Sequence, residues 1–137
     1  MNIRLYNARI LSMVPGEEMY EGEVHIDRNR IIYAGNKTEG GKFDKEIDCE
    51  GNVLMTGFKN AHTHSGMTAF RSLADDLNLQ DWLNNEIFPR EAKMTGEDVY
   101  WLSKLAFLEY LQTGVTAIAD MYLTPETISD AAAEFGM

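Results

Sequence analysis

The residues best placed to do chemistry in this sequence are two histidines, His62 and His64, separated by Thr63. In an extended strand, residues i and i+2 point to the same side, so both imidazoles can reach one ion. Imidazole nitrogens bind zinc at about 2.0–2.1 Å, and the spacing therefore predicts a metal-binding pair. The alternative is a pair of ordinary hydrogen-bonded histidines. The metal hypothesis is favoured because an apolar strand gives way here to a polar loop (Ser65-Gly66), and α/β sheets bind ligands at such strand ends.

Two apolar segments are predicted to form the strands that position this pair. Val53-Leu54-Met55 leads into residues 56–61, which we expect to be a strand or a pair of strands crossing from one sheet into a second layer. Residues 115–120 are short, apolar and almost uncharged, as is typical of a strand buried in a parallel sheet. With helices between and after them, these strands indicate an α/β fold built of β/α units.

Helix signals fill the rest of the second half. Asn78 is predicted to cap a helix that Pro89 ends, because proline has no N–H to donate. A second helix is expected after Thr95, with Asp98 completing a capping box and Gly114 supplying the left-handed C-terminal position. Both sides of this helix are expected to meet protein, because its apolar residues cover a broad face: Val99, Leu102, Leu105, Ala106, Leu108 and Leu111.

A third helix is predicted with Thr124 as its cap, Pro125 at its first position and Gly136 just past its end. The sequence stops at Met137, where another strand is expected, so it indicates the N-terminal part of a longer protein.

The first half, residues 1–54, is predicted to be a small β-sheet unit, and residues 55–137 a second domain. β-branched residues are frequent in the first half, and turn formers break them at Pro15-Gly16, Arg28-Asn29 and Gly40-Gly41. Such breaks suit hairpins between short antiparallel strands. His25 is expected to be a half-exposed strand residue.

The charge balance excludes some classes of partner. Twelve Lys and Arg residues against 22 Asp and Glu residues give a net charge of −10, which disfavours binding to nucleic acid or to a membrane surface. No apolar stretch approaches the ~18 residues of a membrane span. The single Cys49 cannot form an internal disulfide. Together these features, with the absence of a signal peptide at Met1–Leu5, predict a cytoplasmic protein.

Residues 51–64 resemble the first barrel strand of the amidohydrolase superfamily, which has the pattern Pro-Gly-Phe-x-x-x-His-x-His. Thr56 stands where that pattern usually has proline. Other segments are similar to the 5′-methylthioadenosine/S-adenosylhomocysteine deaminases and their chlorohydrolase relatives within that superfamily: Met67-Thr68, residues 71–77, Trp82-Leu83, Pro89-Arg90-Glu91 and residues 114–122.

The resemblance implies a (β/α)₈ TIM barrel flanked by a small β-sandwich. A barrel of this kind needs about 250 residues. This chain is therefore expected to hold the first sandwich strands and about two barrel units, an incomplete part of the fold. The resemblance places the remaining ligands and the proton-shuttling glutamate on later strands, so no catalytic residue is expected within residues 1–137.

The resemblance also implies an activity. One divalent metal ion, expected to be zinc and held in part by His62 and His64, would activate water to deaminate an adenosine-type nucleoside. Glu91 matches the position that accepts hydrogen bonds from the ribose hydroxyls. Trp82 would wall the nucleoside pocket, although helical spacing equally suits a core tryptophan. Asp120 is expected to orient a neighbouring group or to cap the turn after its strand.

Other functions remain open at this stage. The enzyme could be a guanine or cytosine deaminase or a triazine chlorohydrolase, with a heterocyclic amine as its substrate. The chain could also be a non-catalytic fragment that needs a partner, and alone it is expected to be inactive. Exposed apolar faces predict association, either as a homo-oligomer or with the missing part.

Overall fold

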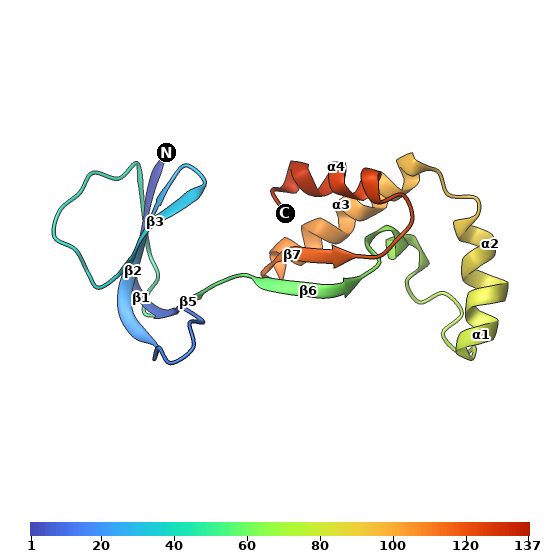
Figure 1. Cartoon of the computed structure of the whole chain (residues 1–137), viewed down its shortest axis with the longest axis horizontal. Helices are drawn as coiled ribbons and strands as arrows, with labels where there is room; N and C mark the ends of the chain where they lie inside the picture. The colour runs from blue at the N-terminus through green and yellow to red at the C-terminus, as the bar shows by residue number, and fades with distance from the viewer. The chain divides into compact units, whose positions relative to one another are not determined.

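The computed structural model describes residues 1–137 and divides them into two units, Met1–Thr56 and Gly57–Met137 (Figure 1). Strands make up the first unit, and a parallel strand pair with helices makes up the second. This is the mixed α/β content that the sequence predicts, and no barrel closes within these residues. No helix of the chain combines the length and the apolar character that crossing a membrane requires.

The first unit is one five-stranded mixed sheet. Its strands are β1 (Asn2–Leu11), β2 (Tyr20–Asp27), β3 (Arg30–Gly35), β4 (Lys45–Asp48) and β5 (Val53–Met55). The order is β3-β2-β1-β4, and β5 also pairs with β1. Pairs β1–β2 and β2–β3 are antiparallel as predicted, but β4 and β5 run parallel to β1. Gly40-Gly41 therefore lies in the long connection between β3 and β4, which do not pair with each other, and not in a hairpin turn.

Strand β1 is a single strand with one irregularity along its length. A bulge between Leu5 and Ala8 carries the interruption, with Asn7 in the left-handed region at φ 54°. Ala8 and Ile10 of β1 pack with Val24 of β2 as the buried core of this sheet. A bulge absorbs one irregular residue without ending the ladder, which is why the strand continues.

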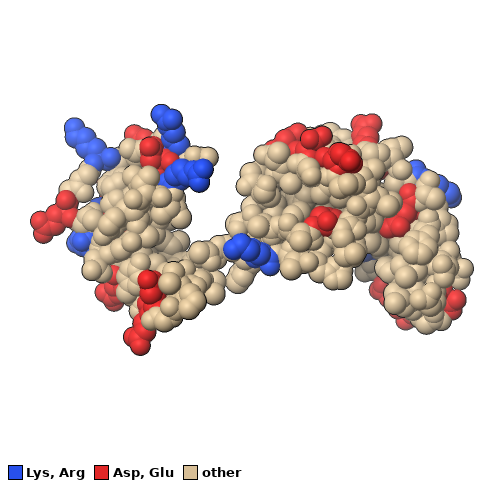
Figure 2. Space-filling model, in the orientation of Figure 1, with Lys and Arg blue, Asp and Glu red and all other residues tan.

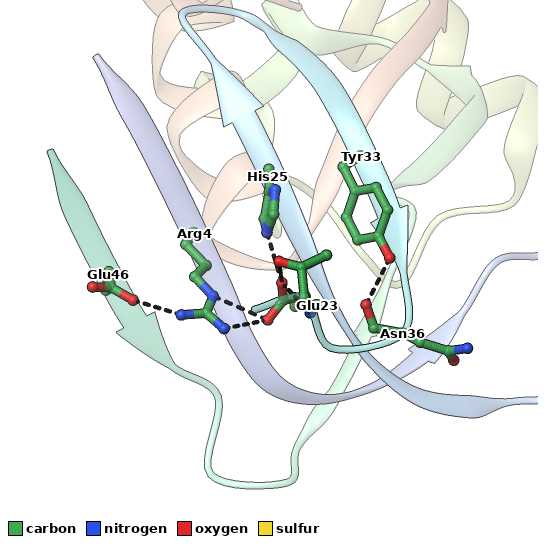
Figure 3. Close-up of polar contacts among 7 residues, drawn as sticks. Arg4, Glu23, His25, Tyr33, Asn36 and Glu46 are labelled. Carbon is green, nitrogen blue, oxygen red and sulfur yellow. Dashed lines mark hydrogen bonds and ion pairs between the residues drawn. The ribbon is translucent and has the colours of Figure 1, made fainter. Parts of the chain in front are cut away.

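The buried carboxylate of Glu23 ties this sheet together (Figure 3). Its side chain is 1% exposed, and Oε2 accepts from Arg4 Nε at 3.0 Å and Nη2 at 2.6 Å. Its Oε1 accepts from Thr38 N and Oγ1 and contacts His25 Nε2 at 2.8 Å. Arg4 Nη1 also reaches Glu46 of β4 at 3.0 Å. One carboxylate thus joins β1, β2 and the segment after β3, and through Arg4 reaches β4.

His25 is more buried than the sequence pattern predicts. Its side chain is 12% exposed. Its ring lies between those of Tyr33 and Phe43, with centroids 4.9 and 4.7 Å away. The period-2 pattern of β2 could not indicate this cover, because Phe43 comes from the connection between β3 and β4.

The second unit pairs β6 (Phe58–Thr63) with β7 (Val115–Asp120) in parallel, as predicted. The connection between them holds the 3₁₀ helix η1 (Ser65–Phe70), α1 (Leu79–Asp81), the π-helix η2 (Trp82–Ile87), α2 (Phe88–Glu91) and α3 (Gly96–Gln112). Helix α4 (Pro125–Phe135) follows β7. Buried Val99, Phe107, Ile128 and Ala131 form the core between α3 and α4.

Local signals fix both ends of α3. Thr95 and Asp98 form the reciprocal capping box, and Gly114 follows the helix at φ 84°. Only one face of α3 is buried, however, and it carries Val99, Ser103, Ala106 and Phe107. Leu105 and Leu108 are exposed. The prediction that both sides of this helix meet protein is therefore wrong within residues 1–137.

One predicted helix boundary, at Pro89, is wrong, whereas α4 begins at Pro125 and is followed by Gly136 as predicted. The helical run continues from Leu79 through Glu91, with Asn78 as the predicted cap and Pro89 inside the first turn of α2. The preceding π-helix widens the spiral, which gives the proline ring room that a regular α-helix lacks. Thr124 makes no side-chain cap, because its left-handed backbone (φ 52°) is not the extended conformation that N-caps adopt.

Acidic side chains are spread over both units, and basic ones form separate groups on the face drawn in Figure 2. The net charge of −10 is therefore not confined to one of the two units.

The Glu23 cluster predicts an acid-sensitive sheet. Burial by itself would raise the pKa of the Glu23 carboxyl, but hydrogen bonds from Thr38, Arg4 and His25 outweigh it and lower the pKa from 4.5 to about 2. A depressed folded-state pKa means stability that is present above pH 4.5 and is lost as the pH falls towards 2. We expect Glu23→Gln to lower the free energy of unfolding by about 3 kcal/mol at pH 7 and by much less near pH 2.

Urea denaturation followed by circular dichroism at several pH values measures this difference. The matched control is Glu21→Gln, since Glu21 is an exposed glutamate on the same strand. Equal pH dependence in the parent and in Glu23→Gln would contradict the assignment.

Candidate metal centre

The two histidines converge at the carboxyl end of β6. Their Nε2 atoms lie 3.1 Å apart, and the ring planes are inclined at 73°. Two nitrogen ligands at about 2.0–2.1 Å from a tetrahedral zinc ion lie about 3.3 Å apart, so the observed spacing suits a shared ion. Without an ion, one imidazole nitrogen can donate to the other across the same gap. The chain contains no group of three or more His, Cys, Asp or Glu side chains that could hold a metal. The metal-binding role of His62 and His64 stays a prediction.

Thr63 anchors the strand from its opposite face. The side chain is 5% exposed, and its hydroxyl meets the Tyr110 hydroxyl of α3 in a short contact and Ser65 Oγ at 3.4 Å. Its carbonyl accepts from Met121 N at 3.2 Å. Alternation along β6 thus turns the histidines toward one side and the anchoring residue toward the other.

Asp120, the last residue of β7, fixes the turn that follows the histidines. Its Oδ2 accepts from Ser65 N at 2.9 Å, and its Oδ1 accepts from Tyr122 N at 3.0 Å. The carboxylate thus holds the neighbouring strand end and also caps its own turn. Both roles that the sequence suggests for Asp120 are realised together.

Tyr122 connects the histidine pair with Glu91. Its ring lies edge-on to His64, with centroids 6.3 Å apart, and its hydroxyl contacts Met94 Sδ at 3.5 Å. Burial, together with a hydrogen bond to the Glu91 carboxylate, raises the pKa of the Tyr122 hydroxyl. Sequence reasoning did not select Tyr122, although it lies two residues beyond Asp120 at the end of a buried strand.

Glu91 is half-buried at the end of α2. Its carboxylate therefore lies at the hydroxyl end of the Tyr122 ring, while His64 lies beside that ring. The fold thus brings together three parts of the sequence: the histidine pair at 62 and 64, residue 91 and residue 122. The ribose-binding role of Glu91 stays a prediction.

Trp82 lies in a different environment. Its indole Nε1 donates to Leu73 O at 2.8 Å, and its ring lines a hollow of about 500 Å³ with residues of segment 67–79. Neither histidine nor Glu91 lines that hollow. The structure therefore does not group Trp82 with the histidine pair, and its pocket role stays a prediction.

The model of the amidohydrolase family matches residues 53–136, more than half of the chain. The chain belongs to the amidohydrolase family. The expected resemblance is thereby confirmed.

Curated relatives of this amidohydrolase chain include a 5-methylthioadenosine/S-adenosylhomocysteine deaminase of Desulfitobacterium hafniense. The two are 41% identical over 136 residues, which cover 96% of this chain and 32% of that enzyme. The chain thus spans about a third of the length of the curated relatives it matches.

Solved structures show the same fold. A triazine hydrolase from Arthrobacter aurescens superposes with a TM-score of 0.87 at 21% identity, covering 99% of this chain and 34% of that one. An adenosine deaminase from Xanthomonas campestris with bound zinc gives 0.85 at 25% identity, covering 97% and 31%. The chain therefore has the fold of the N-terminal third of amidohydrolase structures.

Close packing between Gly66 and Tyr122 gives a testable prediction. A Cβ on Gly66 would lie 2.5 Å from ring atoms Cδ1 and Cε1 of Tyr122. Gly66→Ala must therefore displace the ring or the turn, and we expect it to destabilise the protein by about 1–3 kcal/mol. Thermal and urea denaturation measure the change.

Gly96→Ala is the matched control, because a Cβ there meets only Thr127 Oγ1 at 3.4 Å. The cost of Gly66→Ala should also shrink in a Tyr122→Ala background, where the obstructing ring is gone. An undiminished cost in that background would show that Tyr122 is not the obstruction.

Proposed function

We propose that this chain forms the first third of a metal-dependent aminohydrolase that deaminates adenosine-type nucleosides, such as 5′-methylthioadenosine and S-adenosylhomocysteine. The observation that carries the proposal is the convergence of His62 and His64 Nε2 atoms, 3.1 Å apart, at the carboxyl end of a parallel strand. The 41% identity to a deaminase of that specificity over 96% of the chain supports the substrate class.

A divalent ion, for which zinc is our proposal, would supply an activated water at this site. His62 and His64 would hold that ion through Nε2, and their approach to one side of β6 is already set by the backbone. The zinc in the related adenosine deaminase structure supports the choice of metal. The remaining ligands and the proton-transferring carboxylate would come from outside residues 1–137, since these residues contain no larger donor cluster.

Glu91 would bind the ribose. A carboxylate has two acceptor oxygens and can receive a hydrogen bond from each of two neighbouring hydroxyls. Glu91 is a partner of the Tyr122 hydroxyl, and the Tyr122 ring lies beside His64, which supports a substrate whose base lies at the metal and whose sugar lies near Glu91. The nucleoside would thus be bound at two positions, its base at the metal and its ribose at Glu91.

The second candidate is a hydrolase acting on a free base or a triazine. It is favoured by the structural match to triazine hydrolase, with a TM-score of 0.87, although identity of 21% bears on the fold alone. Glu91 discriminates between the candidates, because a free base or a triazine has no ribose for it to bind.

Substitution of Glu91 tests the nucleoside proposal in the full natural protein. We expect Glu91→Ala to lower kcat/KM for 5′-methylthioadenosine by about 30- to 100-fold, the loss of charge-assisted hydrogen bonds worth about 2–3 kcal/mol. Turnover of free adenine, if measurable, should change only a few-fold. Ammonia release in a coupled assay gives both numbers.

Glu97→Ala, which removes an exposed glutamate from the first turn of α3, is the control and should leave both substrates unaffected. Equal losses for nucleoside and free base would refute the ribose assignment for Glu91.

The isolated chain gives a separate prediction. Two imidazoles leave half of a tetrahedral site unfilled, so residues 1–137 alone should release no measurable ammonia from 5′-methylthioadenosine, even with added zinc. The measurement is the same coupled assay with the purified chain at high concentration. Robust turnover would mean that the chain supplies ligands and a proton shuttle that we have placed elsewhere.

A further inference from the structure

Both neighbours of His64 are held by side chains from other elements of the fold. Thr63 precedes His64 and contacts the Tyr110 hydroxyl of α3. Ser65 follows it, is 1% exposed, and donates its backbone N–H to Asp120 of β7. His64 itself has φ −131° and ψ 69°, which belongs to neither a regular strand nor a helix. Its conformation is therefore imposed by its neighbours.

We propose that Asp120 is a positioning residue that sets the direction of the His64 imidazole by fixing the turn after it, with Tyr110 holding the strand from behind. This inference rests on the proposed function, because it gives the histidine pair its metal-binding role. The geometry that supports it is the pair of bonds from Ser65 N and Tyr122 N to the two oxygens of one carboxylate, at 2.9 and 3.0 Å.

A carboxylate is the side chain suited to this task. Ionised aspartate is an acceptor on both oxygens, so it can satisfy two backbone N–H groups at once. An asparagine of the same shape offers only one acceptor and turns an NH₂ group toward the other donor. The Asp120→Asn change therefore releases either the turn after His64 or the turn at Tyr122 without creating a cavity.

We assign Asp120 a positioning role and not that of a metal ligand. Each of its oxygens already receives a backbone N–H, and these two bonds hold the turns that follow the two strands. It acts on the ion through the backbone of residue 65 and the orientation of residue 64. Groups that orient metal-ligating histidines typically change metal affinity by 10- to 100-fold when they are substituted.

The test measures metal binding rather than catalysis, in the full natural protein freed of metal by a chelator. Zinc affinity is obtained by competition with a chromogenic chelator, and the visible absorption spectrum of bound cobalt reports the ligand geometry. We expect Asp120→Asn to weaken zinc binding by about 10- to 100-fold and to alter the cobalt spectrum. Tyr110→Phe, which removes only the hydroxyl that meets Thr63, should weaken binding in the same direction.

Asp130→Asn is the matched control, because it makes the same chemical change at an exposed aspartate of α4. It should leave affinity and spectrum unchanged. Thermal unfolding of the metal-free proteins separates a positioning effect from a general loss of structure, since a merely structural residue would lower the melting temperature without changing the cobalt spectrum of the folded protein.

The outcomes separate the two proposals. If the parent binds zinc tightly, His62→Ala abolishes binding and Asp120→Asn binds as the parent does, the positioning role is overturned and the proposed function stands. If the parent binds no zinc, or His62→Ala binds as well as the parent, the proposed function falls and this inference falls with it. If Asp120→Asn does not fold, Tyr110→Phe decides, and parental affinity there overturns the proposal.

Discussion

The parallel pairing of β6 with β7 is the constraint on which the candidate site depends. In this pairing Thr63 lies opposite Asp120, so both strands end at the same edge of the sheet. An antiparallel partner would carry its last residue to the other edge, out of reach of the turn after His64. Because the strands are parallel, one aspartate can receive both the N–H of Ser65 and that of Tyr122. The register thus places Ser65 and Asp120, which are 55 residues apart in the sequence, within hydrogen-bond distance of each other.

Successive side chains of β6 point to opposite sides of the strand. His62 is exposed and Thr63 is buried, so the candidate metal ligand lies on one side and the anchoring residue on the other. The anchor reaches Tyr110, whose position follows from the ends of α3, the capping box at Thr95 and the left-handed Gly114. Local signals far from the histidines therefore help to place them. The helix and the strand end that carries the histidines are linked by this hydroxyl contact and by the packing of α3 against η1.

The parts of this structure that the sequence could predict are those set by local chemistry. The capping box, the left-handed Gly114 and the strand 115–120 depend on a few neighbouring residues, and they form as expected. The convergence of His62 and His64 follows from strand periodicity, and the turn contacts of Asp120 follow from its place at the end of its strand. The helix continues past Pro89, contrary to the prediction, because a π-helix precedes this proline and no residue pattern in the sequence indicates a π-helix. Contacts such as Thr63–Tyr110 and Arg4–Glu23 join separate elements, and only tertiary packing could reveal them.

Tyr122 relates the proposed substrate preference to the length of the substrate molecule. One rigid ring touches the His64 imidazole and, at its hydroxyl end, influences Glu91. The ring packs closely on Gly66, where an added Cβ would lie 2.5 Å from ring atoms Cδ1 and Cε1. Under the proposed function, this packed ring would help to set the distance between the metal and the sugar. A nucleoside would then occupy both proposed positions, whereas a free base or a triazine would occupy only the one beside His64.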